Sequence, residues 1–283
     1  MTTPTMSTST AGIGGILPDQ YGPIITQPVQ RESVAMQAAT VMATGNHTLN
    51  IPLVLEDAGA AWVAEGAEIS PDDAVFGETS VTPSKVAGLT IMTRELAEDS
   101  TPSAVQSVGN GLARSIADQV DRAFFGALAA PAPSGLEAVT GLTTITGPTA
   151  WADLDPFAAA IAAADGHGAV VTSFVAHPDD ALLLAQLKES SGSNRPLLGS
   201  DPTTPTRRVL QGVPLLTSPR VTAGTVWALP KDRVIVVRRQ DVDLQVSTDA
   251  YFTSDRVAVR AVMRVGFAFP HPAAIVRVQL ATP

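Results

Sequence analysis

The side chains able to bind a metal or carry catalysis are few in this sequence and widely spaced. The chain has four histidines and no cysteine. No two histidines stand three or four residues apart, so none forms the pair on one helix face that zinc sites use. Disulfides and thiolate ligands are excluded. Asp179 and Asp180 after His177-Pro178 could imitate a metal cluster, but acids at a helix start, where they favour the helix dipole, explain them better.

Motifs for phosphate binding and nucleophilic catalysis are also missing. The glycine-rich stretches at 12–15 and 166–168 lack the Lys-Ser/Thr pair or the glycine spacing of a phosphate loop. No Gly-x-Ser-x-Gly nucleophile elbow occurs. The acids between Glu56 and Glu78 do not follow the spacing of a calcium loop, and a solvated loop surface is the better interpretation. The sequence predicts no catalytic residue, metal or cofactor.

Two groups of arginines remain as candidate contacts. Arg256, Arg260 and Arg264 share one face of an alternating segment, where they could meet phosphates or acids on an adjoining strand or subunit. The net charge of −9 favours the acids. Arg207 and Arg208 lie in a loop and could face DNA, although an exposed solubilising pair is the favoured interpretation.

Composition indicates a protein that buries a core and has apolar surface to spare. The chain has 283 residues, 45% of them hydrophobic and 16% charged, with a mean hydropathy of +0.19. No apolar stretch approaches the ~18 residues of a membrane span, and the N-terminus has no secretory signal. Such chains often cover surplus surface with copies of themselves. A pI of about 4.8 argues against a dedicated nucleic-acid binder, but not against a protein that encloses DNA without gripping it.

The first half of the chain contains three extended or periodic features. Residues 1–30, rich in Thr, Gly and Pro, cannot order themselves alone and are either a loose tail or an arm that orders on a neighbour. Strands at 49–55 and 79–93 frame the acidic stretch and predict a long hairpin, with Pro52 marking an edge. Because an isolated hairpin is marginal in water, it must pack on its own domain or on another subunit.

A long helix follows the hairpin. Thr101 can cap it, and apolar residues spaced by three and four continue to Leu128, which predicts a helix of about 27 residues and ~40 Å. Gly109 and Gly111 lie in its interior, either as tolerated flexibility or as a place where the helix bends. The polar residues Arg114, Asp118, Asp121 and Arg122 are expected on other faces.

The second half of the chain indicates an α/β middle and a β-rich end. Helices are expected at 155–166 and 178–188, strands at 169–175, 213–217 and 226–229, and a loop at 190–208. The β-rich end has expected strands at 234–237, 242–246, 256–265 and 275–280. The segment 256–265 alternates almost perfectly between apolar and polar residues.

In its order of segments, the chain resembles the major capsid proteins of tailed bacteriophages, which have the Hong Kong 97-type fold. The resemblance covers roughly residues 30–283, and no single motif in it is specific. The stretches that carry it are Trp62-Val-Ala-Glu-Gly66 with Phe76, residues 81–100, residues 116–126 with 133–136, Leu210-Gln-Gly-Val-Pro-Leu215 with Ser218, and residues 252–264 with 272–273.

The resemblance implies an α+β capsid fold with six parts. These are an N-terminal arm (1–48), an extended β-hairpin loop (49–93), the spine helix of a peripheral domain (94–133), an α/β axial domain (134–230), peripheral-domain strands (231–268) and a C-terminal strand returning to the axial domain (269–283). The expected inter-subunit contacts are Trp62, Val63, Glu65, Phe76, Lys85 and Arg94. Gly109 and Gly111 are the expected bend, and Arg207, Arg208, Arg256, Arg260 and Arg264 are expected to face another subunit or DNA.

The same resemblance implies a structural protein of the virion, not an enzyme. Hexamers and pentamers would tile an icosahedral head around double-stranded DNA, without sequence-specific binding, membrane or cofactor, after assembly in the host bacterial cytoplasm. The expected partner is a portal protein. Because no helical leader of ~100 residues precedes the arm, either a separate scaffolding protein or none is expected, and a decoration protein is an optional further partner.

One departure concerns the covalent cross-link of the founding family member, which joins a lysine of the extended loop to an asparagine of a neighbour. Here no lysine lies between Leu53 and Ser84, and no asparagine follows Asn194. We therefore expect no such cross-link and a single denatured band near 29.2 kDa, whereas a ladder of bands would contradict this.

Three other functions compete with this one. An encapsulin-like nanocompartment shares the fold, but the long Pro/Gly arm fits a virus better. An α/β enzyme is disfavoured by the missing motifs. A phage tail-tube protein would also polymerise, but tube subunits are mainly β, and the long helix argues against one.

Overall fold

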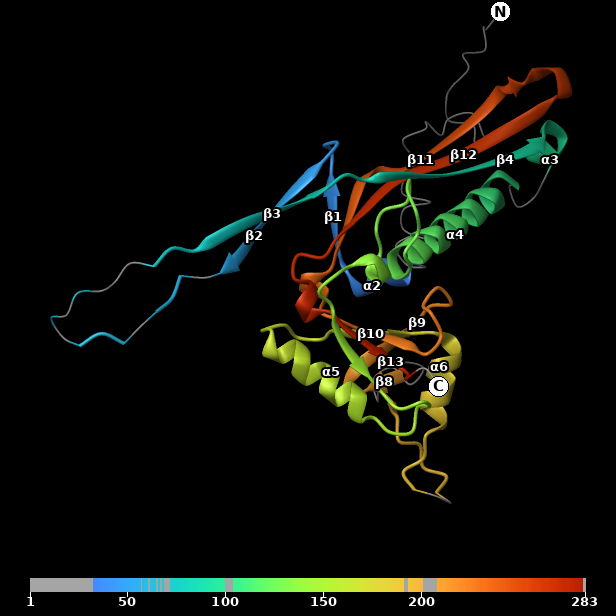
Figure 1. Cartoon of the computed structure of the whole chain (residues 1–283). Coiled ribbons are helices and arrows are strands. Elements are labelled where there is room, and N and C mark those ends of the chain that lie inside the picture. Colours follow the sequence, from blue (N-terminus) through green and yellow to red (C-terminus); the bar gives the residue numbers. More distant parts are fainter. Residues whose placement is uncertain are drawn as a thin grey trace, which may run out of the picture. The chain divides into compact units, whose positions relative to one another are not determined.

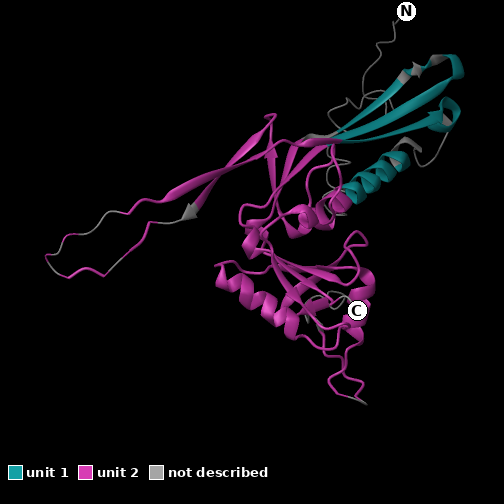
Figure 2. Cartoon of the chain, in the orientation of Figure 1, with its two compact units in different colours: residues 1–32, 86–119, 240–263 teal, residues 33–85, 120–239, 264–283 magenta. Residues whose placement is uncertain are grey.

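The computed structural model describes residues 33–56, 58–60, 62–64, 66, 68, 72–99, 104–190, 193–200 and 208–281. The chain divides into two compact units, coloured separately in Figure 2. The described part of unit 1 comes from segments 86–119 and 240–263, and that of unit 2 from segments 33–85, 120–239 and 264–281. Among the described residues, no helix is both long enough and apolar enough to cross a bilayer.

The α/β middle of the chain forms a seven-stranded sheet in unit 2, in the order β5-β13-β10-β6-β9-β8-β7. Helices α5 and α6 belong to the same unit as this sheet (Figure 1). Phe157 of α5 and Leu184 of α6 are fully buried in one core cluster with alternate residues of the central strands, such as Phe174, Val226 and Val278. The elements are β5 (Thr143–Thr146), α5 (Asp155–Gly166), β6 (Ser173–Ala176), α6 (Pro178–Gln186), β7 (Gly199–Ser200), β8 (Arg208–Leu210), β9 (Val213–Thr217), β10 (Thr225–Leu229) and β13 (Val276–Gln279).

The sequence predictions for this region agree closely with the structure. The expected helix at 155–166 has those bounds, and the expected helix at 178–188 ends two residues early, at Gln186. The strand expected at 169–175 begins only at Ser173. Within the expected loop at 190–208, the short strands β7 and β8 pair with each other, a detail that loop composition does not predict.

A second sheet has four strands in the order β1-β11-β12-β4, namely β1 (Thr40–Thr44), β11 (Ile235–Tyr251), β12 (Arg256–Ala268) and β4 (Ser84–Thr93). The two strands expected at 234–237 and 242–246 are one continuous strand, β11. The alternation in β12 is confirmed for the apolar side, because Val257, Val259, Ala261 and Met263 are buried. On the other side Arg256 and Arg260 are exposed, but Ala258 between them is buried.

The long helix is α4 (Ala104–Phe125), preceded by two short helices, α2 (Val34–Ala38) and α3 (Arg94–Asp99). The predicted cap at Thr101 lies outside the described residues. The helix ends at Phe125 instead of Leu128, just before Gly126. The chain then returns so close to the helix end that a Cβ on Gly135 would lie 2.0 Å from the carbonyl oxygen of Ala123. Short 3₁₀ turns occur at Leu136–Ala138, Lys231–Arg233, Phe252–Ser254 and Pro272–Ala274.

The predicted hairpin consists of β2 (Leu49–Glu56) and β3 (Val75–Val81), which pair antiparallel from Leu49↔Val81 to Val54↔Phe76 (Figure 1). Its predicted return strand at 79–93 is wrong as one element. The strand breaks at Thr82–Pro83, and β4 joins the four-stranded sheet instead. Proline has no amide hydrogen to continue the ladder, and β12 passes so close that a Cβ on Gly266 would lie 2.6 Å from the Val81 side chain.

Candidate functional site

The histidines and paired acids do not come together as a metal or catalytic centre. Within the described part of the chain, no group of three or more His, Asp and Glu side chains could hold a metal ion. His177 caps the start of α6, where its Nδ1 accepts a hydrogen bond from the Asp179 amide at 3.2 Å. The prediction that Asp179 and Asp180 belong to a helix start is confirmed.

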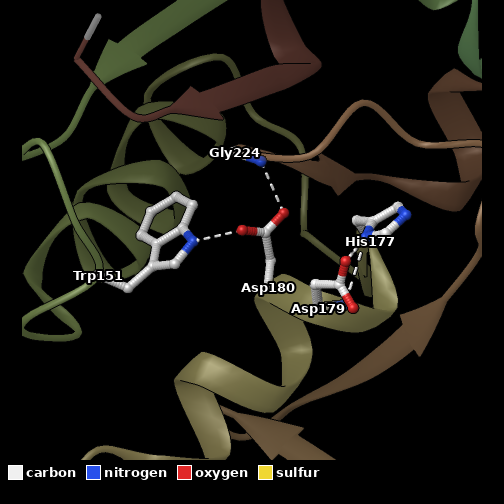
Figure 3. A network of polar contacts seen from close by, with 5 residues as sticks. All are labelled: Trp151, His177, Asp179, Asp180 and Gly224. Atoms are coloured by element: carbon white, nitrogen blue, oxygen red, sulfur yellow. Dashed lines mark hydrogen bonds and ion pairs between the residues drawn. The ribbon is translucent and has the colours of Figure 1, made fainter. Parts of the chain in front are cut away.

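Asp180 ties three segments of the seven-stranded unit together (Figure 3). Its side chain is buried, accepts a hydrogen bond from Trp151 Nε1 at 2.8 Å and accepts another from the Gly224 amide at 2.7 Å. Both donors lie in loops, one before α5 and one before β10. The network holds those loops against α6 and is therefore structural.

The hairpin β2–β3 carries a set of exposed apolar side chains that its own subunit does not cover. Its base is packed, since Leu49 and Ile51 contact a buried cluster that includes Val81 and Val237. Toward the tip, Trp62 is fully exposed and Phe76 is 73% exposed. The other exposed apolar residues are Val54, Val63 and Val75. Glu65, an expected contact, lies outside the described residues. We call Trp62, Val63, Val75 and Phe76 the tip surface.

The hairpin also carries negative charge, and side-chain hydrogen bonds link its two legs. Glu68, Asp72, Asp73 and Glu78 are exposed. The carboxylate of Asp72 accepts a hydrogen bond from the Gly59 amide at 2.6 Å, which links the two legs of the loop. The tip surface is therefore apolar with an acidic surround, as expected of a docking surface rather than of a catalytic one.

The two cations expected at subunit contacts differ in their surroundings. Lys85 is exposed on β4. Arg94 forms an ion pair with Asp255 of the same unit, with 3.5 Å between the guanidinium and the carboxylate, and its amide donates to the Asp255 carbonyl at 3.1 Å. Arg94 thus contributes to the turn between β11 and β12.

The arginine row of β12 is solvent-facing, as its alternation indicates. Arg260 donates to the side-chain oxygen of Gln245 on the neighbouring strand, and the Gln245 amide donates to Asp243 at 2.8 Å. Arg260 thus contacts the amide side chain of Gln245, and the expected pairing of the arginines with acids stays a prediction. Arg256 is exposed and Arg264 is half-buried. Arg208 is exposed at the start of β8, and Arg207 lies outside the described residues.

A junction around Asp121 joins the segment that leads out of residues 1–32 to the long helix. Asp121 is buried, and its Oδ1 accepts hydrogen bonds from Ser33 Oγ at 2.6 Å and from the Ala35 amide at 3.0 Å. Its Oδ2 accepts from the Val34 amide at 3.0 Å and from Ser218 Oγ at 3.4 Å. All four donors are neutral, and desolvation by burial raises the pKa of Asp121 above its ordinary value of 3.8.

The expectation that Asp121 lies on a polar face of the helix is wrong. It belongs to the same buried stripe as Ala117 and Phe124, at helical spacings of four and three residues. That spacing was the available signal. The burial of Asp121 was missed because aspartate is seldom buried, so its residue type was given more weight than its spacing from the apolar residues.

Gly109 and Gly111 lie within α4, which continues through both. Gly109 is buried and Gly111 is half-buried. At Gly111 an added Cβ would meet only the end of the Arg114 side chain, at 3.9 Å, so this glycine is not required by packing.

Comparison with known proteins places the chain among viral shells. The sequence pattern of the phage capsid family matches residues 14–280. A structure from Microbacterium phage Oxtober96 has a TM-score of 0.73 at 16% identity, covering 88% of this chain and 91% of that one. The capsid of a native GTA particle has a TM-score of 0.69 at 18% identity, covering 100% and 96%. A virus-like particle from Pyrococcus furiosus has a TM-score of 0.62 at 12% identity, covering 91% and 97%. A search of curated proteins finds no match.

Proposed function

Because this chain belongs to the phage capsid family and is a major capsid shell protein of the virion, we propose that it assembles into hexamers and pentamers that tile an icosahedral head around double-stranded DNA. Assembly would take place in the host bacterial cytoplasm. The chain is a structural protein, and we assign it no enzymatic activity of its own.

The tip surface is the observation that carries the proposal of subunit-to-subunit docking. A fully exposed tryptophan and a largely exposed phenylalanine on the same hairpin present apolar surface to water, and apolar surface of this kind often marks an interaction site. Aromatic residues are also the side chains that most often dominate the binding energy of protein interfaces. A neighbouring subunit is the partner that a shell supplies at every position.

Charge complements this docking. The hairpin carries exposed acids, and β12 carries the exposed Arg256 and Arg260. We propose that the acids of one hairpin face the arginine row of an adjacent copy, and that Lys85 is a separate inter-subunit contact. Because exposed pairs are screened by salt, this contribution to assembly should weaken as ionic strength rises.

The net charge of the chain affects how the shell would interact with the enclosed DNA. A net charge of −9 opposes tight, sequence-specific binding of DNA, so the shell would enclose its DNA rather than grip it. Arg207 and Arg208 are the candidate cations for weak contact with it. A portal protein, a separate scaffolding protein and a decoration protein are proposed partners on the strength of the family alone.

Negative-stain microscopy of the expressed, purified chain tests the proposal. We expect round shells or ring-shaped capsomers. Open tubes would instead support a tail-tube protein, and a monomer at every concentration would contradict both. An encapsulin-like compartment is the second candidate because of the likeness to the Pyrococcus furiosus particle, although the Microbacterium phage and GTA structures named above have higher TM-scores. Shells that co-purify with one specific enzyme would favour it.

The two glycines of α4 supply a prediction about shell maturation. Replacing Gly109 and Gly111 together with alanine should stiffen the helix, because each replacement favours the helical backbone by ~1 kcal/mol. If the helix must bend between an early and a mature shell, the double variant should assemble but fail to change diameter. Particle diameter by microscopy is the measurement, and a normal transition would show that the glycines are merely tolerated.

A further inference from the structure

A cleft of about 770 Å³ lies along the base of the hairpin within unit 2. One wall is formed by four consecutive residues of β2, residues 51–54, and by none of β3, and the opposite wall is segment 270–274. Because neighbouring side chains of a strand point to opposite faces, four residues in a row line a cleft only along the edge of the strand. In the described sheet β2 pairs with β3 alone, so the cleft borders an open strand edge.

The cleft offers no net charge to an occupant. Its two charged side chains, Asp232 and Arg233, form an ion pair in which 3.1 Å separates the guanidinium nitrogen from the carboxylate oxygen. His167 and His271 are the remaining ionisable residues of the lining. An uncharged, extended segment that can hydrogen-bond to a strand edge therefore fits this cleft better than an acidic or a basic segment does.

The start of the described chain lies next to the cleft. The amide of Thr40 donates to the carbonyl of Val234 at 2.9 Å, and its hydroxyl donates to the carbonyl of Lys231 at 2.7 Å. These two carbonyls flank the charged pair of the lining. Only α2 and one further residue separate Thr40 from Ser33, so these two residues lie within roughly 17 Å of each other. The hydrogen bonds to Asp121 hold Ser33 at that place.

The chain before the described part contains a run that matches the cleft. Residues 20–30 carry no charged side chain, and the β-branched residues 24–26 favour a strand. Pro23 and Pro28 lack the amide hydrogen that pairing needs, so they limit such a strand to residues 24–27. The run thus has the same length as the β2 wall of the cleft.

We propose that residues 24–27 add as a third strand to the open edge of β2, in the cleft of the same subunit. The run precedes Ser33 by six to nine residues, so it can reach about 20–30 Å from Ser33 at ~3.3 Å per residue. A short tether of this kind gives an effective concentration on the order of millimolar, which favours the subunit's own cleft over that of a second copy.

This contact covers a strand edge that could otherwise pair with other chains, and it braces the hairpin at its base. It goes beyond the proposed shell function and does not depend on it, because a dispersed subunit contains both the run and the cleft.

Engineered cysteines joined by a short bismaleimide test the contact in dispersed full-length subunits, because the native chain has no cysteine. Ile25→Cys/Ala273→Cys carries one thiol on the run and one on the wall opposite β2. After tryptic digestion of the monomer band, mass spectrometry should find peptide 1–31 joined to peptide 265–277.

The matched control for this link is Ile25→Cys/Leu183→Cys. Leu183 is exposed on α6 in the same unit and does not line the cleft. Its link to the run should form with a yield at least about tenfold lower, because no contact raises the local concentration of the two thiols.

Hydrogen exchange gives a second test that needs no engineered thiol. Ile24→Asp/Ile25→Asp places two charges in a run that must enter an uncharged cleft. Exchange of the β2 amides that do not pair with β3 should therefore become at least about tenfold faster. Thr5→Asp/Thr8→Asp adds the same charges farther from Ser33 and should leave the exchange of these amides unchanged.

The outcomes separate this contact from the shell function. A link found only in the dimer band would assign the run to a second copy and overturn the same-subunit contact. A yield no higher than the control, or β2 amides that exchange equally fast in the wild-type and Ile24→Asp/Ile25→Asp subunits, would also overturn it. Each of these results leaves the shell function standing, because both measurements use dispersed subunits.

Discussion

Replacing Asp121 with alanine is expected to lower the free energy of unfolding of the dispersed subunit by about 3 kcal/mol or more. The substitution removes an acceptor of four hydrogen bonds and leaves the amides of Val34 and Ala35 without that partner at a buried site. The substitution should also loosen the start of α2, in addition to destabilising the whole subunit, because Asp121 holds the start of α2 against α4. Denaturant unfolding measures the first effect, and limited proteolysis near Ser33 measures the second.

Two control variants sharpen this test. Asp165→Ala, at an exposed acid in α5, should change stability by less than about 0.5 kcal/mol. Asp121→Asn keeps the shape but replaces one acceptor oxygen with an amide group that can only donate, so it should lose much of the same stability. An unfolding free energy of Asp121→Ala equal to that of Asp165→Ala would show that the junction is dispensable.

The same carboxylate should leave a signature in the pH dependence of stability. Burial raises the pKa of Asp121 in the folded chain, so folding favours its protonated form. Its contribution to stability is therefore fully present below the ordinary value of 3.8 and is lost as the pH rises through the raised pKa. Relative to Asp121→Asn, the wild-type subunit should gain stability on mild acidification.

The second large effect is expected at the tip surface. Replacing Trp62 and Phe76 together with serine should reduce shell formation at least about thirtyfold, because losing even one buried aromatic anchor at an interface typically costs about 2 kcal/mol or more. The subunit itself should keep its unfolding midpoint, since both side chains are exposed. Val170→Ser, which alters another exposed apolar side chain, should assemble normally. Sedimentation measures assembly, and unimpaired shells from the double variant would exclude these residues as anchors.

Local patterns in the sequence were sufficient to predict most elements of the fold. The alternation in 256–265 and the helical spacing in 101–128 depend on which side of an element faces a core, and both elements are present. The break at Pro83 was not foreseen, because the apolar pattern continues across it. Strands β3 and β4 differ in the sheet that they join, since β3 pairs with β2 and β4 belongs to the four-stranded sheet. Local periodicity does not encode which distant segments pair with each other.

The residues of the candidate site also differ in whether the sequence alone could predict them. The exposed aromatics near Gly66 and the outward arginines of β12 follow from local composition, so the sequence points to them. Asp121 could not be recognised as a junction, because its partners Ser33 and Ser218 lie 88 and 97 residues away. Nor do local patterns indicate the order of strands in the seven-stranded sheet, since strand order is a tertiary property.

Quenching of tryptophan fluorescence by acrylamide tests most directly whether the tip surface is covered by a neighbouring subunit. The chain has three tryptophans; Trp227 is fully buried, Trp151 is 6% exposed, and Trp62 is fully exposed. In dispersed subunits Trp62 should therefore account for nearly all of the quenching. If assembly covers the hairpin tip, closed shells should lose this accessible fraction and shift their emission to shorter wavelength. Closed shells in which Trp62 remains as quenchable as in dispersed subunits would contradict the account.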